Sequence, residues 1–147
     1  MKILQALIAG FAGSAALNLL HEIVRRYDPD APRIDLLGEE ALSRSLNSLN
    51  ISTPKGQDLY LATLASDFIS NGFYYSAIGF AGKKNLYFKA AVSGLTAGLG
   101  AISLPEKIGL DDEPVTRCNK TKVLTVAWYL AGGLVTAIVF SKLTKKA

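Results

Sequence analysis

The sequence predicts an all-α integral membrane protein, a four-helix bundle of transmembrane helices with an amphipathic interfacial helix in its first loop. Half of the 147 residues are hydrophobic and only 19% are charged, whereas soluble domains carry about 25% charged residues. The hydrophobic residues form four long blocks with almost no charge. Six of the twelve acidic residues lie in 28–58 and four in 106–113. We therefore expect one transmembrane domain, 1–147, with spans at about 3–24, 58–81, 86–104 and 123–141.

The first block has a ridge of small residues that becomes polar toward its end. About 22 residues, Ile3 to Val24, are long enough to cross a hydrocarbon core of about 30 Å. Every fourth position lies on one side of a helix, and here these positions are Ala6, Gly10, Ser14, Asn18 and Glu22. A cleaved signal peptide would also begin with a lysine and an apolar run. We expect the segment to be retained as a span.

The polar connection 27–57 is predicted to contain the interfacial helix. Pro29 and Pro32 keep the residues before them extended. Asp35 is predicted to cap a helix that continues to about Leu49. Its apolar side chains share one face, namely Ala41, Leu42, Leu46 and Leu49. This pattern fits a helix lying on the bilayer surface, and it fits a flap over the bundle equally well.

The second block contains an acidic residue in the middle of a predicted span, Asp67. An acid at that depth costs about 2.5–3.5 kcal/mol on insertion scales, so it is expected to be protonated, paired or hydrated. Its face of the helix also carries polar side chains, namely Thr63, Ser70, Asn71 and Tyr74. Two interpretations remain open. Asp67 either serves a ligand or proton pathway, or bonds Asn18, Ser70 or Tyr129 and only fixes helix packing.

The third and fourth blocks carry small residues at spacings that permit close helix approach. Ala90, Gly94 and Gly98 form a small-xxx-small pattern. The fourth block is uncharged from 123 to 141 and has a face formed by Thr125, Trp128, Tyr129, Gly132, Gly133 and Thr136. These seams exceed what one small bundle obviously needs. They predict a homo-oligomer or docking onto a partner membrane subunit.

Four spans place both termini and the turn 82–85 on the same side of the bilayer. That side carries only lysines: Lys2, Lys83, Lys84, Lys89, Lys142, Lys145 and Lys146. Short basic flanks are typical of cytoplasmic loops, so we expect both termini in the cytoplasm, although the opposite loops hold slightly more basic residues in total. The alternative is a soluble four-helix bundle. Its glycine-rich helices would cost about 1 kcal/mol per glycine in water.

Polar residues of several spans converge toward the side opposite the termini. They predict a ligand-binding site formed by Asn18, His21, Glu22, Asp67, Asn71, Tyr74 and Tyr129. In this hypothesis Asp67 anchors the ligand, Asn71 and Tyr74 orient it, and His21 and Glu22 guard the mouth. The predicted function is binding or transport of a small polar molecule or cation within the bilayer.

Two other functions are compatible with the same residues. A non-catalytic accessory or assembly subunit would use the polar groups only to specify helix pairing. A membrane enzyme would use His21 and Asp67 as acid and base on a lipid-soluble substrate, and this is the less favoured function. We assign no catalytic residue.

The sequence gives no basis for a cofactor, a metal site or a nucleic-acid partner. Arg25 stands where an HExxH zinc motif would need its second histidine, and one histidine cannot supply two haem ligands. Cys118 is the only cysteine, so an internal disulfide and a cysteine metal cage are excluded. No P-loop or GxSxG motif is present. The lysines flank apolar blocks and do not form a stripe interleaved with aromatics, as nucleic-acid binding would need.

Overall fold

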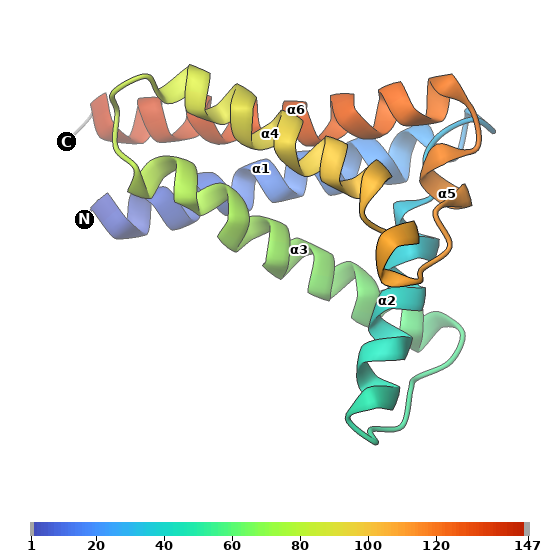
Figure 1. The fold of residues 1–147 in the computed structure, drawn as a ribbon. Coiled ribbons are helices and arrows are strands. Elements are labelled where there is room, and N and C mark those ends of the chain that lie inside the picture. The colour runs from blue at the N-terminus through green and yellow to red at the C-terminus, as the bar shows by residue number, and fades with distance from the viewer. Residues whose placement is uncertain (1, 146–147) are drawn as a thin grey trace.

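The computed structural model describes residues 2–145, and these are helical with no strand among them (Figure 1). Four long helices carry the fold: α1 (Lys2–Val24), α3 (Gln57–Phe80), α4 (Leu86–Ser103) and α6 (Asn119–Lys145). α2 (Ile34–Ser48) lies in the first connection. The last connection holds a short 3-10 turn, η1 (Glu106–Ile108), and the single-turn helix α5 (Glu113–Thr116).

The long helices run lengthwise, and the short ones gather at one end. α6 packs against both α1 and α4, while α3 packs along α1 and diverges from the other helices toward its N-terminus (Figure 1). Both chain ends and the turn between α3 and α4 lie at one end of the molecule, here called the terminal end (Figure 1). α2, η1 and α5 lie at the opposite end, here called the loop end, and α2 runs crosswise to the long helices (Figure 1).

Small residues on α1 allow two helices to approach it closely. A Cβ atom added to Gly10 would lie 2.5 Å from the carbonyl oxygen of Gly72 on α3. A Cβ atom on Gly13 would collide with the Thr136 side chain and the Gly132 carbonyl oxygen on α6. The ridge predicted on the first block therefore lies against α3 at Gly10, and its neighbour Gly13 lies against α6.

The seam between α4 and α6 is built in the same way. Added Cβ atoms would lie 2.6 Å from the Cα of Leu130 at Gly94, and 2.7 Å from the Cα of Val126 at Gly98. A Cβ atom at Gly133 would lie 2.6 Å from the carbonyl oxygen of Ala90. The small-residue seams are thus used within one chain. The expectation that they exceed the needs of one bundle is wrong, and oligomerisation stays a prediction without this support.

Many buried positions carry small side chains, beside a few large ones such as Tyr75 and Phe140, and many large apolar side chains are exposed. Buried positions on the long helices include Ala6, Ala9, Ser14, Ser76, Ala90, Thr125, Thr136 and Ala137. Large hydrophobic side chains are exposed on every long helix, with Ile3 at 69%, Phe73 at 57%, Phe88 at 70% and Val123 at 66% exposure. Soluble proteins bury most of their large hydrophobic side chains.

Two helices, α1 and α6, are long and apolar enough to cross a membrane. Among residues 2–145 no other helix meets both measures. Core helices of soluble proteins can have the same length and composition, so this finding indicates membrane insertion only weakly. The structure is thus an all-helical protein in which two helices are candidate membrane spans, whereas the sequence predicts four spans.

The helix boundaries agree with the predicted spans to within a few residues, except that α6 begins one turn before 123 and continues to Lys145. The role predicted for Asp35 is wrong. Arg33 occupies the N-cap position of α2, and no side-chain hydrogen bond caps this helix. The Asp35 carboxylate instead accepts hydrogen bonds from His21, Arg25 and Arg33.

Candidate functional site at the loop end

A buried carboxylate joins the start of α2 to the end of α1. Oδ1 of Asp35 lies 3.3 Å from Nε2 of His21, and the Asp35 side chain is only 7% exposed. Arg33 donates to it twice, from Nε at 2.9 Å and from Nη2 at 2.7 Å. Arg25 adds a longer bond from Nη1 at 3.4 Å. These four residues, His21, Arg25, Arg33 and Asp35, form what we call the Asp35 cluster.

The Asp35 cluster holds its carboxylate in the ionised form. Burial by itself would raise the pKa of Asp35, but the hydrogen bonds from His21 and Arg33 and their charges outweigh it. The pKa of Asp35 therefore lies well below its usual range. Its position in the first turn of α2 also favours a negative charge, because the N-terminal end of a helix carries partial positive charge. Asp35 is thus a fixed anion at neutral pH.

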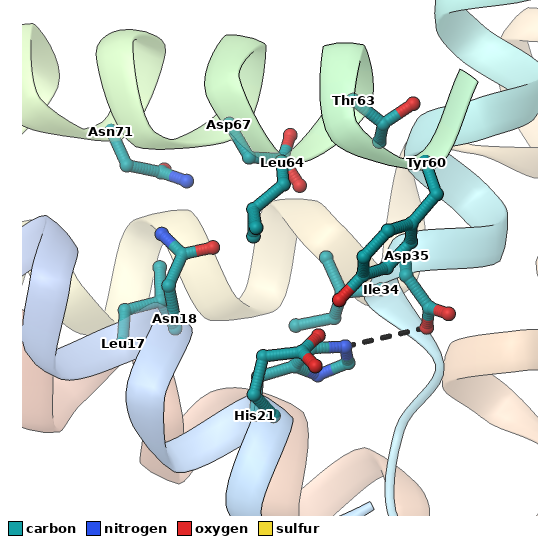
Figure 2. A pocket seen from close by; sticks show the side chains of 11 residues that line it. Leu17, Asn18, His21, Ile34, Asp35, Tyr60, Thr63, Leu64, Asp67 and Asn71 are labelled. Carbon is teal, nitrogen blue, oxygen red and sulfur yellow. Dashed lines mark hydrogen bonds and ion pairs between the residues drawn. The ribbon is translucent and has the colours of Figure 1, made fainter. Parts of the chain in front are cut away.

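A small cavity lies beside this cluster, between α1, α2 and α3 (Figure 2). The volume that the centre of a water molecule can occupy there is about 10 Å³, which is room for about one water. The lining side chains come from all three helices and are Leu17, Asn18, His21, Glu22, Ile34, Asp35, Tyr60, Thr63, Leu64, Asp67 and Asn71. The cavity therefore suits a water or a small ion far better than an organic molecule.

Asp67 extends from the middle of α3 into this region (Figure 2). Among residues 2–145, none donates a hydrogen bond to its carboxylate and no basic side chain pairs with it. Asn18 donates to the carbonyl oxygen of Ser14 instead, at 3.0 Å. The hypothesis that Asp67 only locks the bundle through Asn18, Ser70 or Tyr129 has no such bond to rest on.

α2 covers Asp67 through a glycine. A Cβ atom added to Gly38 would lie 3.4 Å and 3.6 Å from the two carboxylate oxygens of Asp67. The same atom would lie 2.7 Å from Cγ2 of Thr63. A side chain at position 38 would crowd the Thr63 methyl group, so glycine here allows α2 to lie close over Asp67.

Several polar atoms around the cavity are buried without a partner in the described part of the chain. They are Nδ1 of His21, Oε1 of Glu22 and Oγ1 of Thr63. Leaving such a group unpaired costs about 1–3 kcal/mol, and unpaired groups are rare in native structures. Their concentration around one small cavity gives it the chemistry to bind a small polar or charged species.

Glu22, which lines the cavity, forms an ion pair with Arg25. Nη2 of Arg25 donates to Oε2 of Glu22 at 2.8 Å and to the Tyr60 hydroxyl at 3.1 Å. The guanidinium carbon of Arg25 also lies 5.5 Å from the centre of the Tyr60 ring. Glu22 is predicted to lie at the entrance of the site. In the structure Arg25 connects it to Tyr60 of α3, which also lines the cavity.

Five of the seven residues predicted for the site line this cavity: Asn18, His21, Glu22, Asp67 and Asn71. Two do not. The Tyr74 hydroxyl donates to the carbonyl oxygen of Ser93 on α4 at 2.8 Å, because α4 lies beside α3 this far toward the terminal end. Tyr129 packs against the hydrophobic core, where its carbonyl oxygen accepts a hydrogen bond from Tyr75. Ligand binding by the other five stays a prediction.

The cavity is also lined by residues outside the predicted site, among them Asp35, Tyr60, Ile34 and Leu64. Asp35 could be found only by knowing that α2 folds back onto the end of α1, since its partners His21 and Arg25 lie 14 and 10 positions away. Tyr60 lies in the first turn of α3, and only its contact with Arg25 marks it. No local motif signals either residue.

Neither a cluster of metal-ligating side chains among the described residues nor a comparison with known proteins identifies this site. Within residues 2–145, no group of three or more His, Cys, Asp and Glu side chains is arranged to hold a metal ion. Comparisons with protein-family models, with curated proteins and with solved structures found no match to this chain. Its function has to be argued from the site.

Proposed function

We propose that this chain is a small polytopic membrane protein that binds a monovalent cation, either a proton with its water or a bare ion of similar size, at Asp67. The observation that carries the proposal is a carboxylate without a donor at a cavity with room for about one water. Within the described chain, Oε1 of Glu22 and Oγ1 of Thr63 are further buried oxygen atoms without a partner, on residues that line the same cavity. The proposal narrows the predicted small polar ligand to a single ion.

The distribution of apolar side chains supports insertion of all four long helices. Large hydrophobic residues are exposed on α3, at Leu61, Phe68, Ile69, Phe73 and Phe80, and on α4, at Tyr87, Phe88, Val92, Leu95 and Leu99. Monomeric soluble proteins rarely expose contiguous apolar areas of this extent. Lipid covers such a surface without cost, and close packing through glycine is typical of helices in membranes.

The crosswise position of α2 supports an interfacial helix. In a bilayer that contains the four long helices, α2 at the loop end would lie near the membrane surface (Figure 1). It would then cover the Asp67 cavity from the aqueous side, so the two interpretations of this segment, an interfacial helix and a flap, describe the same position. An ion would reach Asp67 either by passing α2 or by entering the cavity beside Glu22.

The alternatives have less support. An acid–base pair of His21 and Asp67 in a membrane enzyme would need the two side chains within hydrogen-bond reach, but Nε2 of His21 lies against Asp35 instead. An accessory subunit needs a specific contact surface for its partner. The small-residue seams that suggested one are used inside the chain.

The proposal is tested by measuring cation and proton binding to purified protein in lipid. We expect infrared titration of the wild type to show one buried carboxyl group whose signal responds to pH or to added Na⁺. Asp67→Asn removes that response. Asp58→Asn is the matched control, because Asp58 is an exposed acid on the same helix outside the cavity. An unchanged response in Asp67→Asn would refute the site.

A further inference from the structure

We infer that a groove at the terminal end binds the headgroup of an anionic phospholipid through Lys2 and Lys83. The groove has a volume of about 820 Å³, within the range of about 300–1,000 Å³ usual for small-molecule sites. It lies between the start of α1 and the ends of α3 and α6, which meet at the terminal end (Figure 1). The inference rests on the proposed membrane insertion but is independent of Asp67.

The lining of this groove has two kinds of side chain, as a phospholipid requires. Lys2 and Lys83 supply positive charge, and Gln5 and Thr144 supply polar groups. Ile3 and Phe80 line the same groove and are 69% and 54% exposed. The ammonium groups suit a phosphate, and the exposed apolar side chains suit the first part of an acyl chain.

Lys83 is held in place at the groove. Its Nζ donates to the carbonyl oxygen of Thr144 near the end of α6 at 2.7 Å. An ammonium group has three donors, so two remain for a phosphate oxygen. Because the side chain is already positioned, binding a headgroup costs less conformational entropy than it would with a free surface lysine.

The charge of the terminal end selects an anion. Among the described residues this end carries the lysines Lys2, Lys83, Lys84, Lys89, Lys142 and Lys145. All twelve acidic residues of the chain lie in 22–67 and 106–113, away from this end. Basic pockets between membrane helices on the cytoplasmic side are suited to anionic lipid headgroups. This orientation agrees with the predicted cytoplasmic termini.

The test uses the full chain in nanodiscs that contain phosphatidylglycerol and phosphatidylcholine with identical acyl chains. Native mass spectrometry or a spin-labelled lipid measures which lipid the protein retains. We expect the wild type to prefer phosphatidylglycerol. A hydrogen bond between a lysine in the groove and a phosphate oxygen contributes about a tenfold change in affinity, so Lys2→Gln lowers the preference about tenfold and Lys2→Gln/Lys83→Gln lowers it further.

The matched control is Lys84→Gln/Lys142→Gln, which removes the same charge at the same end from exposed lysines outside the groove. We expect it to change the preference less than twofold. An equal loss in both double variants would overturn the groove in favour of diffuse attraction. Displacement of the lipid by millimolar inorganic phosphate would overturn the lipid as occupant.

Two measurements keep the outcomes separate. Lys2→Gln removes a side chain on the first described turn, so it tests the groove even if the change at Lys83 disturbs the end of α6. Extraction of vesicles at alkaline pH shows whether the chain is inserted at all. A chain that is not inserted refutes the proposed membrane protein, whereas an inserted chain without lipid preference refutes only the groove.

Discussion

Asp35 accepts hydrogen bonds from basic side chains that come from two parts of the chain, α1 and the residue just before α2. A buried carboxylate is costly unless such donors surround it. Through these donors the first turn of α2 is attached to the end of α1. At the scale of single residues, Asp35 is the structural anion of the loop end, and Asp67 is the anion left available for a ligand.

Removing the charge of Asp35 is expected to destabilise the protein. In Asp35→Asn the guanidinium groups of Arg25 and Arg33 lose their shared partner, and because these two side chains are 22% and 37% exposed, the loss is about 1–2 kcal/mol. The free energy of unfolding in detergent measures the loss. Asp58→Asn, on an exposed site, is expected to change it by less than about 0.5 kcal/mol. Equal stability of the two variants would contradict the role of the Asp35 cluster.

The same carboxylate gives a pH dependence of known sign. The pKa of Asp35 is lower in the folded protein than the value of about 3.9 in the unfolded chain. The stability that ionised Asp35 contributes is therefore fully present above about pH 4. It is lost as the pH falls toward the pKa of Asp35 in the folded protein, because the unfolded state binds the proton first. Wild-type stability measured against pH is expected to fall below about pH 4 more steeply than that of Asp35→Asn.

At the scale of elements, the position of α2 depends on one close approach to α3. Gly38 is the contact point, with Thr63 and Asp67 directly beneath it. The segment before α2 is fastened separately. Arg117 donates to the carbonyl oxygens of Pro29 and Ala31, and Lys120 pairs with Asp28 at 2.7 Å. The start of α2 is thus attached to the end of α1, the segment before it is attached to Arg117 and Lys120, and Gly38 rests on α3.

Gly38→Ala is expected to move α2 away from α3, because the added Cβ atom would lie 2.7 Å from Cγ2 of Thr63. Asp67 then becomes more accessible, and its rate of modification by a carbodiimide rises several-fold. Gly100→Ala is the control, since its Cβ atom would meet only Leu104 at 3.5 Å and alanine is the better helix former. An unchanged rate in Gly38→Ala would mean that α2 does not cover Asp67.

The positions of the helices could be predicted from the sequence, but their contacts could not. Long apolar blocks bounded by Pro105, Lys83 or Arg25 determine where helices begin and end, because these signals are local. Which residues share a cavity depends on how helices cross. Tyr74 lies on the same helix face as Asp67, yet about two turns along the helix a different neighbour, α4, covers that face.

At the scale of the whole molecule, the two ends differ in charge and in backbone structure. The terminal end is basic and has only the short turn between α3 and α4, whereas the loop end holds all acidic residues outside the long helices. A bundle of four spans places these ends in different aqueous compartments. This arrangement separates the proposed cation site from the proposed lipid groove.

Cysteine labelling is expected to show the two ends on opposite sides of the membrane. In a Cys118→Ser background, Lys84→Cys marks the terminal end and Lys107→Cys the loop end, both at exposed positions. A membrane-impermeant maleimide added to sealed, right-side-out vesicles is expected to label only Lys107→Cys, because the termini are predicted to be cytoplasmic. Labelling of both positions would contradict the four-span arrangement.

The glycine seams have a consequence for how the chain tolerates mutation. Backbone atoms of a neighbouring helix lie directly over Gly10, Gly94, Gly98 and Gly133, so even alanine requires two helices to separate there. The large side chains of Phe88 and Val123 are exposed, and another apolar residue of different shape fits equally well there. In a deep mutational scan, the glycines of these seams are therefore expected to be the least replaceable residues, and the exposed large hydrophobic residues among the most replaceable.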